Sequence, residues 1–126
     1  MIYGIGVDLV HIGRMETVLK RWEGRFIERV FTSEEIEFCN KRAFPTPCFA
    51  LRFAAKEAFS KAMGTGFRYP VTLQCISVVQ NRAGKPGFSF HPKLEQLVNS
   101  RGIVSHHLTI SDEAALACAC VVLEAQ

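Results

Sequence analysis

The spacing of apolar and polar positions predicts a strand followed by a helix at the start of the chain. Residues 2–8 are β-prone and contain two glycines, which let another backbone approach a strand closely. Residues 12–24 instead carry apolar side chains at helical spacing, which predicts a helix that ends near a glycine. Asp8 is therefore expected at a strand-to-helix junction.

Two more helices are predicted from signals at their ends. Thr32 and Glu35 have the spacing of a capping box, so we expect a helix from this point to about Lys41. Prolines then interrupt the chain before a second helix, predicted over residues 48–63. Gly64 can end that helix in the left-handed conformation.

The second half of the chain predicts strands with one intervening helix. Strands are expected over residues 71–80, 87–91, 104–111 and 114–123, and a helix over residues 92–101. The last two strands are expected to meet at a tight turn at Asp112 and Glu113. Because strands follow strands without regular crossover helices, the predicted class is α+β, a mainly antiparallel sheet packed with helices in a single domain over residues 1–126.

Composition adds an expectation about self-association. A chain of 126 residues suits one core, but 48% of its residues are hydrophobic and its mean hydropathy is +0.13. So small a protein must leave part of this apolar surface uncovered, so we expect it to associate with itself. No apolar run reaches the roughly 18 residues of a membrane helix, and the first residues lack signal-peptide features, which predicts a cytosolic protein without a membrane partner.

The five cysteines show no zinc-ligand spacing. They are Cys39, Cys48, Cys75, Cys118 and Cys120. We interpret them as reduced, small apolar side chains in a cytosolic protein. The alternative for Cys118 and Cys120, which share one face of a predicted strand, is a redox pair.

Charge narrows the possible partners. The net charge is only +3 and no long basic block occurs, so broad nucleic-acid affinity is not expected. Residues 14–29 are locally basic, and this segment either contacts an acidic partner or is an ordinary solvated helix face. Its cations are Arg14, Lys20, Arg21, Arg25 and Arg29.

Asp8, Glu57 and Lys61 are the candidate catalytic residues. Glu57 and Lys61 are four residues apart on a predicted helix, so they form either a surface ion pair or a site where Glu57 binds Mg²⁺ and Lys61 a phosphate. Asp8 is either a helix cap or a second metal ligand. Gly4 and Gly6 lack the third glycine of a dinucleotide-binding motif, which excludes that function.

These motifs together resemble a known family. The segments are Gly4–Val10 with Arg14, Phe31-Thr32 with Glu35, Arg52–Ala58 with Lys61, Gly64–Gly66, Gly84–Pro86, His107–Asp112 and Val121–Glu124. In order and spacing they resemble the holo-[acyl-carrier-protein] synthases, the small single-domain branch of the 4′-phosphopantetheinyl transferases. The resemblance covers nearly the whole chain.

The resemblance implies Mg²⁺-dependent transfer of 4′-phosphopantetheine from coenzyme A to a serine of apo-acyl carrier protein in fatty acid biosynthesis. Adenosine 3′,5′-bisphosphate would be the other product. Asp8 and Glu57 match the family's magnesium ligands and Lys61 its phosphate-binding lysine. The expected coenzyme A contacts are Arg52, Lys61, Gly64, Thr65, Gly66, Lys85, Pro86 and His107. The family also implies a homotrimer with sites at subunit interfaces, and carrier-protein docking on Arg14, Lys20, Arg21 and Arg25.

Several alternatives stay open from sequence. The base that deprotonates the carrier serine is either Glu57 or a metal-bound water relayed by a carboxylate. His107 is either a coenzyme A contact or a structural histidine, and Asp112 is assigned to the turn. Two other functions stay open. One is hydrolysis of a nucleotide diphosphate by the same Asp8, Glu57 and Lys61, and the other is non-catalytic binding of an acidic protein by the basic helix.

Overall fold

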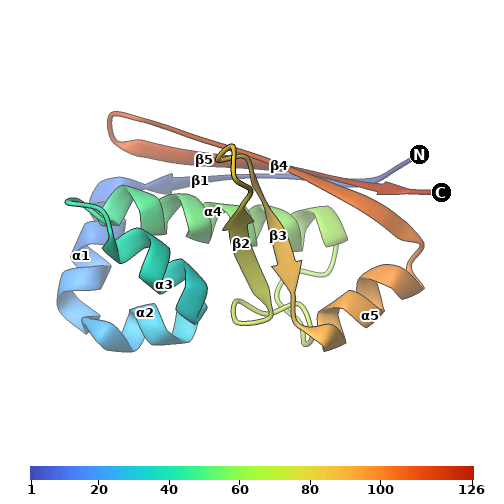
Figure 1. The fold of residues 1–126 in the computed structure, drawn as a ribbon, viewed down its shortest axis with the longest axis horizontal. Coiled ribbons are helices and arrows are strands. Elements are labelled where there is room, and N and C mark those ends of the chain that lie inside the picture. Colours follow the sequence, from blue (N-terminus) through green and yellow to red (C-terminus); the bar gives the residue numbers. More distant parts are fainter.

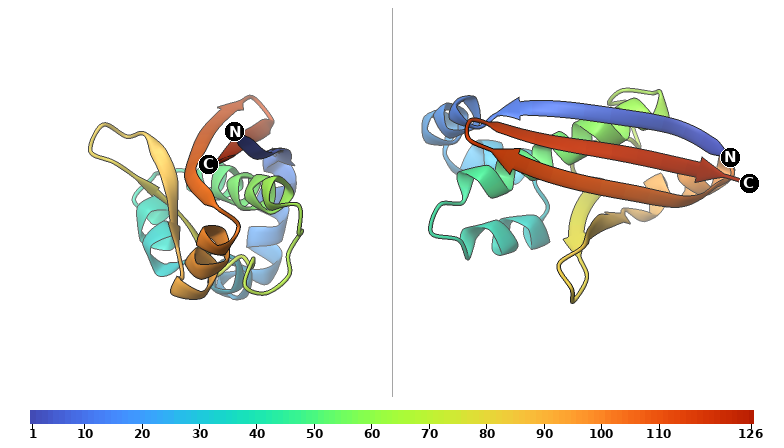
Figure 2. Two further views of the ribbon diagram at one scale, coloured as in Figure 1. Left: turned by 90° about the vertical axis from the view of Figure 1, so that its right-hand side faces the viewer. Right: turned by 90° about the horizontal axis from the view of Figure 1, so that it is seen from above.

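The computed structural model describes residues 1–126 and has one long helix beneath a three-stranded sheet. Strands β1 (Ile2–His11), β5 (Leu116–Ala125) and β4 (Ile103–Glu113) pair in that order, and both pairings are antiparallel. Helix α4 (Thr46–Met63) runs along the inner face of this sheet (Figure 1). The view from above shows the three strands lying over α4 (Figure 2). The predicted α+β class and antiparallel sheet are confirmed.

The other elements lie on the same side of the sheet as α4. They are α1 (Ile12–Trp22), α2 (Gly24–Val30), α3 (Ser33–Asn40), the hairpin of β2 (Ile76–Gln80) and β3 (Pro86–Phe90), and α5 (Pro92–Ser100). The core forms where alanines of α4, such as Ala54 and Ala58, meet the inner face of β5 and the hairpin. Small side chains on α4 thus let the sheet lie close to the helix.

Two glycines of β1 allow it to cross α4 at close range. A Cβ atom added at Gly4 would lie 1.9 Å from the backbone oxygen of Ala62, and one at Gly6 would lie 1.9 Å from that of Ala58. Any side chain at either position would therefore collide with the helix backbone. The glycines noted in the sequence are required by this contact, which holds β1 against α4.

A buried ion pair fixes α4 against the elements below it. The Lys56 ammonium lies 2.6 Å from Glu35 Oε1 and donates two more hydrogen bonds to backbone carbonyls. Glu35 also accepts bonds from the backbone N–H groups of Thr32 and Val78. Burial lowers the pKa of Lys56, and the nearby Glu35 carboxylate opposes this shift. The predicted capping box of Thr32 and Glu35 is confirmed, and its glutamate has this second task.

The observed boundaries correct several predictions. Strand β1 continues to His11, so Asp8 lies inside a strand and not at a junction. The first helix breaks at Glu23, which has a φ of +49°, and α2 follows where no helix was predicted. Residues 71–75 form turns before β2. The last hairpin turns at Ala114, with a φ of +51°, so Asp112 belongs to β4 and its assignment to a turn is wrong.

The expectation that every cysteine is reduced is wrong for one pair. Cys39 near the end of α3 and Cys48 near the start of α4 form a disulfide, with their Cα atoms 5.5 Å apart. That separation lies in the usual range for disulfides, and the short α3–α4 connection produces it. Cys75, Cys118 and Cys120 are free, and no disulfide joins Cys118 to Cys120.

The outer face of the three-stranded sheet is apolar and uncovered. Ile5, Val7 and Leu9 of β1 are each more than half exposed, because residues in alternate positions of a strand point to opposite faces. No element lies over this face in the view of Figure 1.

No helix is long and apolar enough to cross a membrane.

Candidate active site

Asp8 lies on the inner face of β1, at an edge of the sheet. It pairs with Ala119 of β5, and its side chain is 16% exposed. The N-cap residue of α1 is His11, which makes no capping side-chain bond. Asp8 is therefore not a helix cap, which leaves its carboxylate available for other partners.

Lys61 from α4 reaches the Asp8 carboxylate. Its ammonium donates to Asp8 Oδ1 at 3.1 Å and to the backbone oxygen of Val7 at 3.0 Å. The Lys61 side chain is 52% exposed, so it reaches this position from the surface. The close contact of β1 and α4 thus brings together two residues that are 53 positions apart in sequence.

Glu57 lies one helical turn before Lys61. Partial burial raises the pKa of its carboxyl above the ordinary value, the negative charge of Asp8 raises it further, and Lys61 lowers it. Glu57 forms no ion pair with Lys61, so the surface-pair alternative from sequence is not observed. Instead the Glu57 carboxylate is affected by two nearby charges, the repelling carboxylate of Asp8 and the attracting ammonium of Lys61.

This donor set fits a magnesium ion. Asp8 and Glu57 supply hard carboxylate oxygens from two rigid elements, and Mg²⁺ usually takes one or two protein carboxylates together with water and phosphate oxygens. Burial and the negative charge of Asp8 both disfavour the ionised form of Glu57, and a bound cation would favour it. The residues present therefore suit Mg²⁺ without further protein ligands.

The end of α4 continues the site beyond Lys61. Gly64 ends the helix with a φ of +77°, as predicted, and Thr65 donates a hydrogen bond to the backbone of Gly66. Gly64 and Thr65 line a cavity of about 490 Å³ together with Arg68 and Arg101. These two arginines were not among the sequence candidates, because nothing in the sequence indicated that they meet at this loop.

Arg52 lies elsewhere, toward the other edge of the sheet. It is only 2% exposed, its guanidinium is 4.4 Å from the Phe38 ring centre, and its Nε has no hydrogen-bond partner. Burial lowers its pKa to about 10, although the charge of Glu35 acts in the opposite direction. A buried guanidinium lacking a hydrogen bond at Nε is costly, so this arginine is suited to an anion that completes its contacts.

A cavity of about 280 Å³ opens beside Arg52. Arg42 and Asp112 also line it, and neither was a predicted site residue. Asp112 was missed because the sequence predicted a turn there, whereas the longer β4 carries it to this cavity. Arg42 lies just after α3 and has no sequence signal beyond a neighbouring lysine.

The remaining predicted coenzyme contacts are dispersed in one protomer. His107 is on the outer face of β4, where its Nε2 lies 2.5 Å from a carboxylate oxygen of Glu124. Lys85 and Pro86 lie at the β2–β3 turn. Within a single chain, therefore, the structure does not bring His107, Lys85, Pro86 and Arg52 to the Asp8 site.

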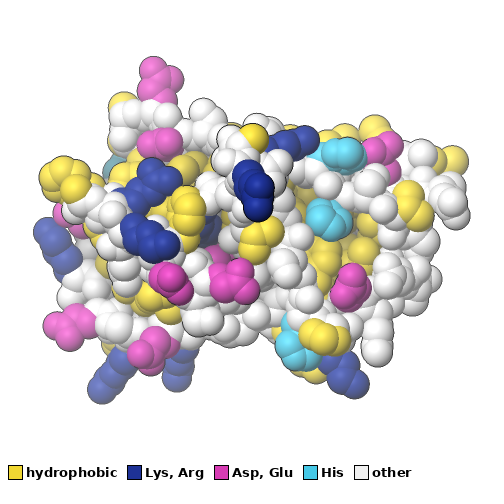
Figure 3. Space-filling model, viewed as in Figure 1, with side chains coloured by type: hydrophobic (Ala, Val, Ile, Leu, Met, Phe, Trp, Pro, Cys, Tyr) yellow, Lys and Arg dark blue, Asp and Glu magenta, His cyan; other side chains and the backbone are white.

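The predicted basic surface runs over α1 and α2. Arg14, Lys20, Arg21 and Arg25 are all exposed, and in Figure 3 many of the dark-blue side chains lie on the half of the molecule that holds α1 to α3. Lys20 is partly engaged by Glu16 in an exposed ion pair at 3.3 Å. The other cations keep the surface positive.

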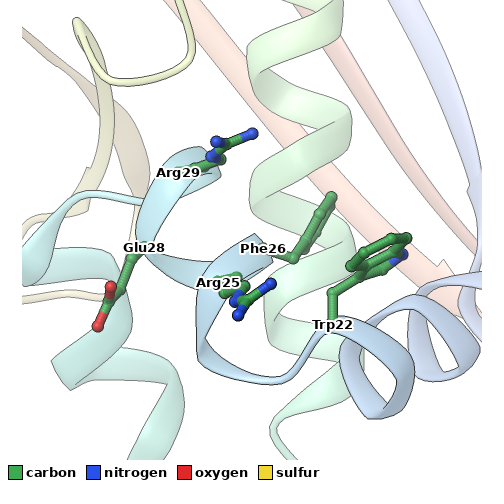
Figure 4. Close-up of a pocket in the computed structure, with 5 residues that line it drawn as sticks. All are labelled: Trp22, Arg25, Phe26, Glu28 and Arg29. Carbon is green, nitrogen blue, oxygen red and sulfur yellow. The ribbon is translucent and has the colours of Figure 1, made fainter.

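A cavity lined by both aromatic and charged side chains accompanies this basic surface. It measures about 760 Å³ and is lined by Trp22, Arg25, Phe26, Glu28 and Arg29. Figure 4 shows Trp22 at the end of α1 and Phe26 on α2, with Glu28 pointing away from both rings. The sequence had indicated the cations but not the aromatic side chains, because the break at Glu23, which places Trp22 and Phe26 on separate helices, was not predicted.

Comparison with known proteins agrees with this fold. The family model of the 4′-phosphopantetheinyl transferase superfamily matches residues 4–119. A holo-[acyl-carrier-protein] synthase of Nitrosospira multiformis is 52% identical over 124 residues, which cover 98% of this chain and 99% of that protein. The crystal structure of holo-[acyl-carrier-protein] synthase from Neisseria meningitidis superposes with a TM-score of 0.94 at 40% identity, covering 98% of this chain and 99% of that one.

A second solved structure carries a ligand. The holo-[acyl-carrier-protein] synthase of Helicobacter pylori, in complex with coenzyme A, has a TM-score of 0.84 at 30% identity and covers 95% of this chain and 99% of that one. These matches span the chain almost completely, and they include the strand of Asp8 and the helix of Glu57 and Lys61. The chain therefore belongs to the 4′-phosphopantetheinyl transferase superfamily, in its holo-[acyl-carrier-protein] synthase branch.

Proposed function

We propose that the protein transfers 4′-phosphopantetheine from coenzyme A to a serine of apo-acyl carrier protein and releases adenosine 3′,5′-bisphosphate. The observation that carries this proposal is the cluster of Asp8, Glu57 and Lys61 where β1 crosses α4. Two carboxylates and an ammonium at one point suit a diphosphate with its metal. The reaction would belong to fatty acid biosynthesis in the cytoplasm.

In this mechanism Asp8 and Glu57 would hold Mg²⁺, which when bound neutralises charge on the diphosphate of coenzyme A. Lys61 would contact the departing phosphate and stabilise the charge that develops there. The carrier serine must lose a proton, and Glu57 is one candidate base. A water molecule positioned by a carboxylate is the other candidate.

Arg52 supports an anchoring site for an anionic group of coenzyme A. Its buried guanidinium faces a cavity and lacks a hydrogen-bond partner at Nε, and coenzyme A carries one phosphate, the 3′-phosphate of its ribose, that is not part of the reacting diphosphate. We propose that Arg52 binds this phosphate. Lys85, Pro86 and His107 are proposed as further coenzyme contacts on the basis of family resemblance.

A homotrimer would bring the separate parts of the site together. Asp8 is at the β1 edge of the sheet, whereas Ile110 and Asp112 of the Arg52 cavity are on β4, at the opposite edge. One ligand could contact both edges if they come from neighbouring copies. The uncovered apolar face of the same sheet supports such an assembly, because it needs a partner surface.

The basic surface of α1 and α2 is the proposed docking site for acyl carrier protein. Arg14, Lys20, Arg21 and Arg25 would attract an acidic partner, and the Trp22–Phe26 cavity would accept an apolar side chain from it. Arg14 is in the first turn of α1, which directly follows the strand that carries Asp8.

Intact-mass spectrometry of apo-acyl carrier protein tests the proposal. Incubation with this protein, coenzyme A and Mg²⁺ should add the mass of one phosphopantetheine group to the carrier. EDTA and the Glu57→Gln variant are the controls, and both should abolish the gain. No gain with several competent carriers would contradict the transferase function and favour diphosphate hydrolysis or simple protein binding.

A further inference from the structure

Lys61 already occupies a cation-binding position in the proposed metal site. Its ammonium bonds to Asp8 Oδ1 at 3.1 Å and to the Val7 carbonyl at 3.0 Å, so two of its three protons point at oxygens of β1. The first of these acceptors belongs to the carboxylate that would also bind Mg²⁺. The same side chain that is suited to phosphate therefore pairs with a metal ligand.

A divalent cation and this ammonium cannot use Asp8 equally well at the same time. Both are attracted to the same carboxylate, and at such short range they repel each other. Asp8 is only 16% exposed, so solvent screens this repulsion less than at an open surface. Metal binding should therefore weaken or displace the contact between Lys61 and Asp8.

The geometry of Lys61 allows such a displacement. Its side chain is 52% exposed and extends from the last turn of α4, beside the loop that begins at Gly64. A lysine has a flexible stem with a terminal charge, so it can turn from one anionic partner to another without moving the helix. A diphosphate bound at this end of the helix would offer that second partner.

We infer that Lys61 couples metal binding to coenzyme binding by competing with the divalent cation for Asp8. Without coenzyme A, the ammonium opposes the cation. With coenzyme A, the diphosphate draws the ammonium away and the cation binds more tightly. This inference rests on the proposed function, because it takes coenzyme A as the diphosphate and Asp8 as a metal ligand.

The test is the affinity of the purified protein for Mn²⁺ without coenzyme A, measured from the electron paramagnetic resonance signal of the free ion. Lys61→Gln should bind Mn²⁺ about three- to tenfold more tightly than the unmodified protein, the size expected for removing one partly exposed competitor. Lys93→Gln removes an equal charge from exposed α5 and should leave the affinity unchanged. A Lys61→Gln affinity equal to or weaker than that of the unmodified protein would overturn the inference.

The second part of the test repeats the Mn²⁺ affinity measurement in the presence of coenzyme A. Saturating coenzyme A should raise the Mn²⁺ affinity of the unmodified protein by a larger factor than that of Lys61→Gln, because the variant has no competitor to displace. If coenzyme A raises the Mn²⁺ affinity of both proteins by the same factor, Lys61 does not couple metal binding to coenzyme binding. Failure of the proposed function is recognised separately: Asp8→Asn would then leave Mn²⁺ binding intact, or apo-acyl carrier protein would gain no mass in the transfer assay.

Discussion

At the scale of single residues, the carboxyl of Glu57 responds to two neighbours of opposite charge. Asp8 raises its pKa and Lys61 lowers it, in addition to the effect of burial. Since only the ionised carboxylate binds a cation, metal affinity should increase as pH rises through this elevated pKa. Without a cation, the contribution of the same group to folding stability is present at low pH and is lost as pH rises through that pKa.

Titration of Glu57 by carbon NMR in metal-free buffer checks this electrostatic arrangement. The carboxyl should titrate above the ordinary value for glutamate. Asp8→Asn should lower its pKa by removing the repulsion, and Lys61→Gln should raise it by removing the attraction. A pKa that rises in Asp8→Asn would show that the two carboxylates do not interact in this way.

Arg14 allows docking to be separated from chemistry. We expect Arg14→Glu to raise the KM for acyl carrier protein about tenfold by reversing a charge on the docking surface. The KM for coenzyme A should change little. Steady-state kinetics with each substrate varied in turn would measure both values, and Lys93→Glu on α5 is the matched charge reversal. Equal effects of Arg14→Glu on both KM values would refute the docking role.

At the scale of elements, the site exists because β1 crosses α4 without intervening side chains. Gly6→Ala would place a Cβ against the Ala58 backbone oxygen and force the strand away from the helix. We expect a loss of at least about 2 kcal/mol in the free energy of unfolding, since backbone atoms cannot easily yield. Chemical denaturation measures this loss.

Gly87→Ala is the matched control for that substitution. Gly87 is also in a strand, and a Cβ there would meet no atom within 4 Å. The free energy of unfolding of Gly87→Ala should stay within about 1 kcal/mol of that of the unmodified protein. If both variants are equally stable, the close crossing is not what holds β1 in place.

The elements also show which features were readable from sequence. The capping box at Thr32, the left-handed end of α4 at Gly64 and the β2–β3 hairpin follow from local chemistry, and all three are confirmed. The break at Glu23 and the turn at Ala114 depend on non-glycine residues with positive φ, which have no local signal. Tertiary packing imposes them.

The candidate site, too, was predicted from sequence only in part. Asp8, Glu57 and Lys61 were singled out by residue type and spacing, and the structure brings them together. The surroundings of Arg52 were not foreseen, because Asp112 approaches it only through the full length of β4. The Cys39–Cys48 disulfide was also not predicted, because it depends on how α3 and α4 meet and no cysteine motif in the sequence indicates that contact.

At the scale of the whole molecule, the uncovered sheet face predicts an oligomer. Val7 is 54% exposed on this face, and Val7→Lys would place a charge where a partner copy is expected. We expect the unmodified protein to sediment as a trimer in analytical ultracentrifugation and the variant to shift toward monomer. Asn99→Lys on α5 should leave the trimer intact. A monomeric unmodified protein would contradict the proposed shared site.

The central claim, group transfer by the Asp8–Glu57–Lys61 cluster, is tested most directly by the stoichiometry of its two products. Chromatography of the nucleotide and intact mass of the carrier should show one adenosine 3′,5′-bisphosphate released for each carrier serine modified. Both should be lost in Asp8→Asn and in EDTA. Release of nucleotide without carrier modification would identify a hydrolase and contradict the account.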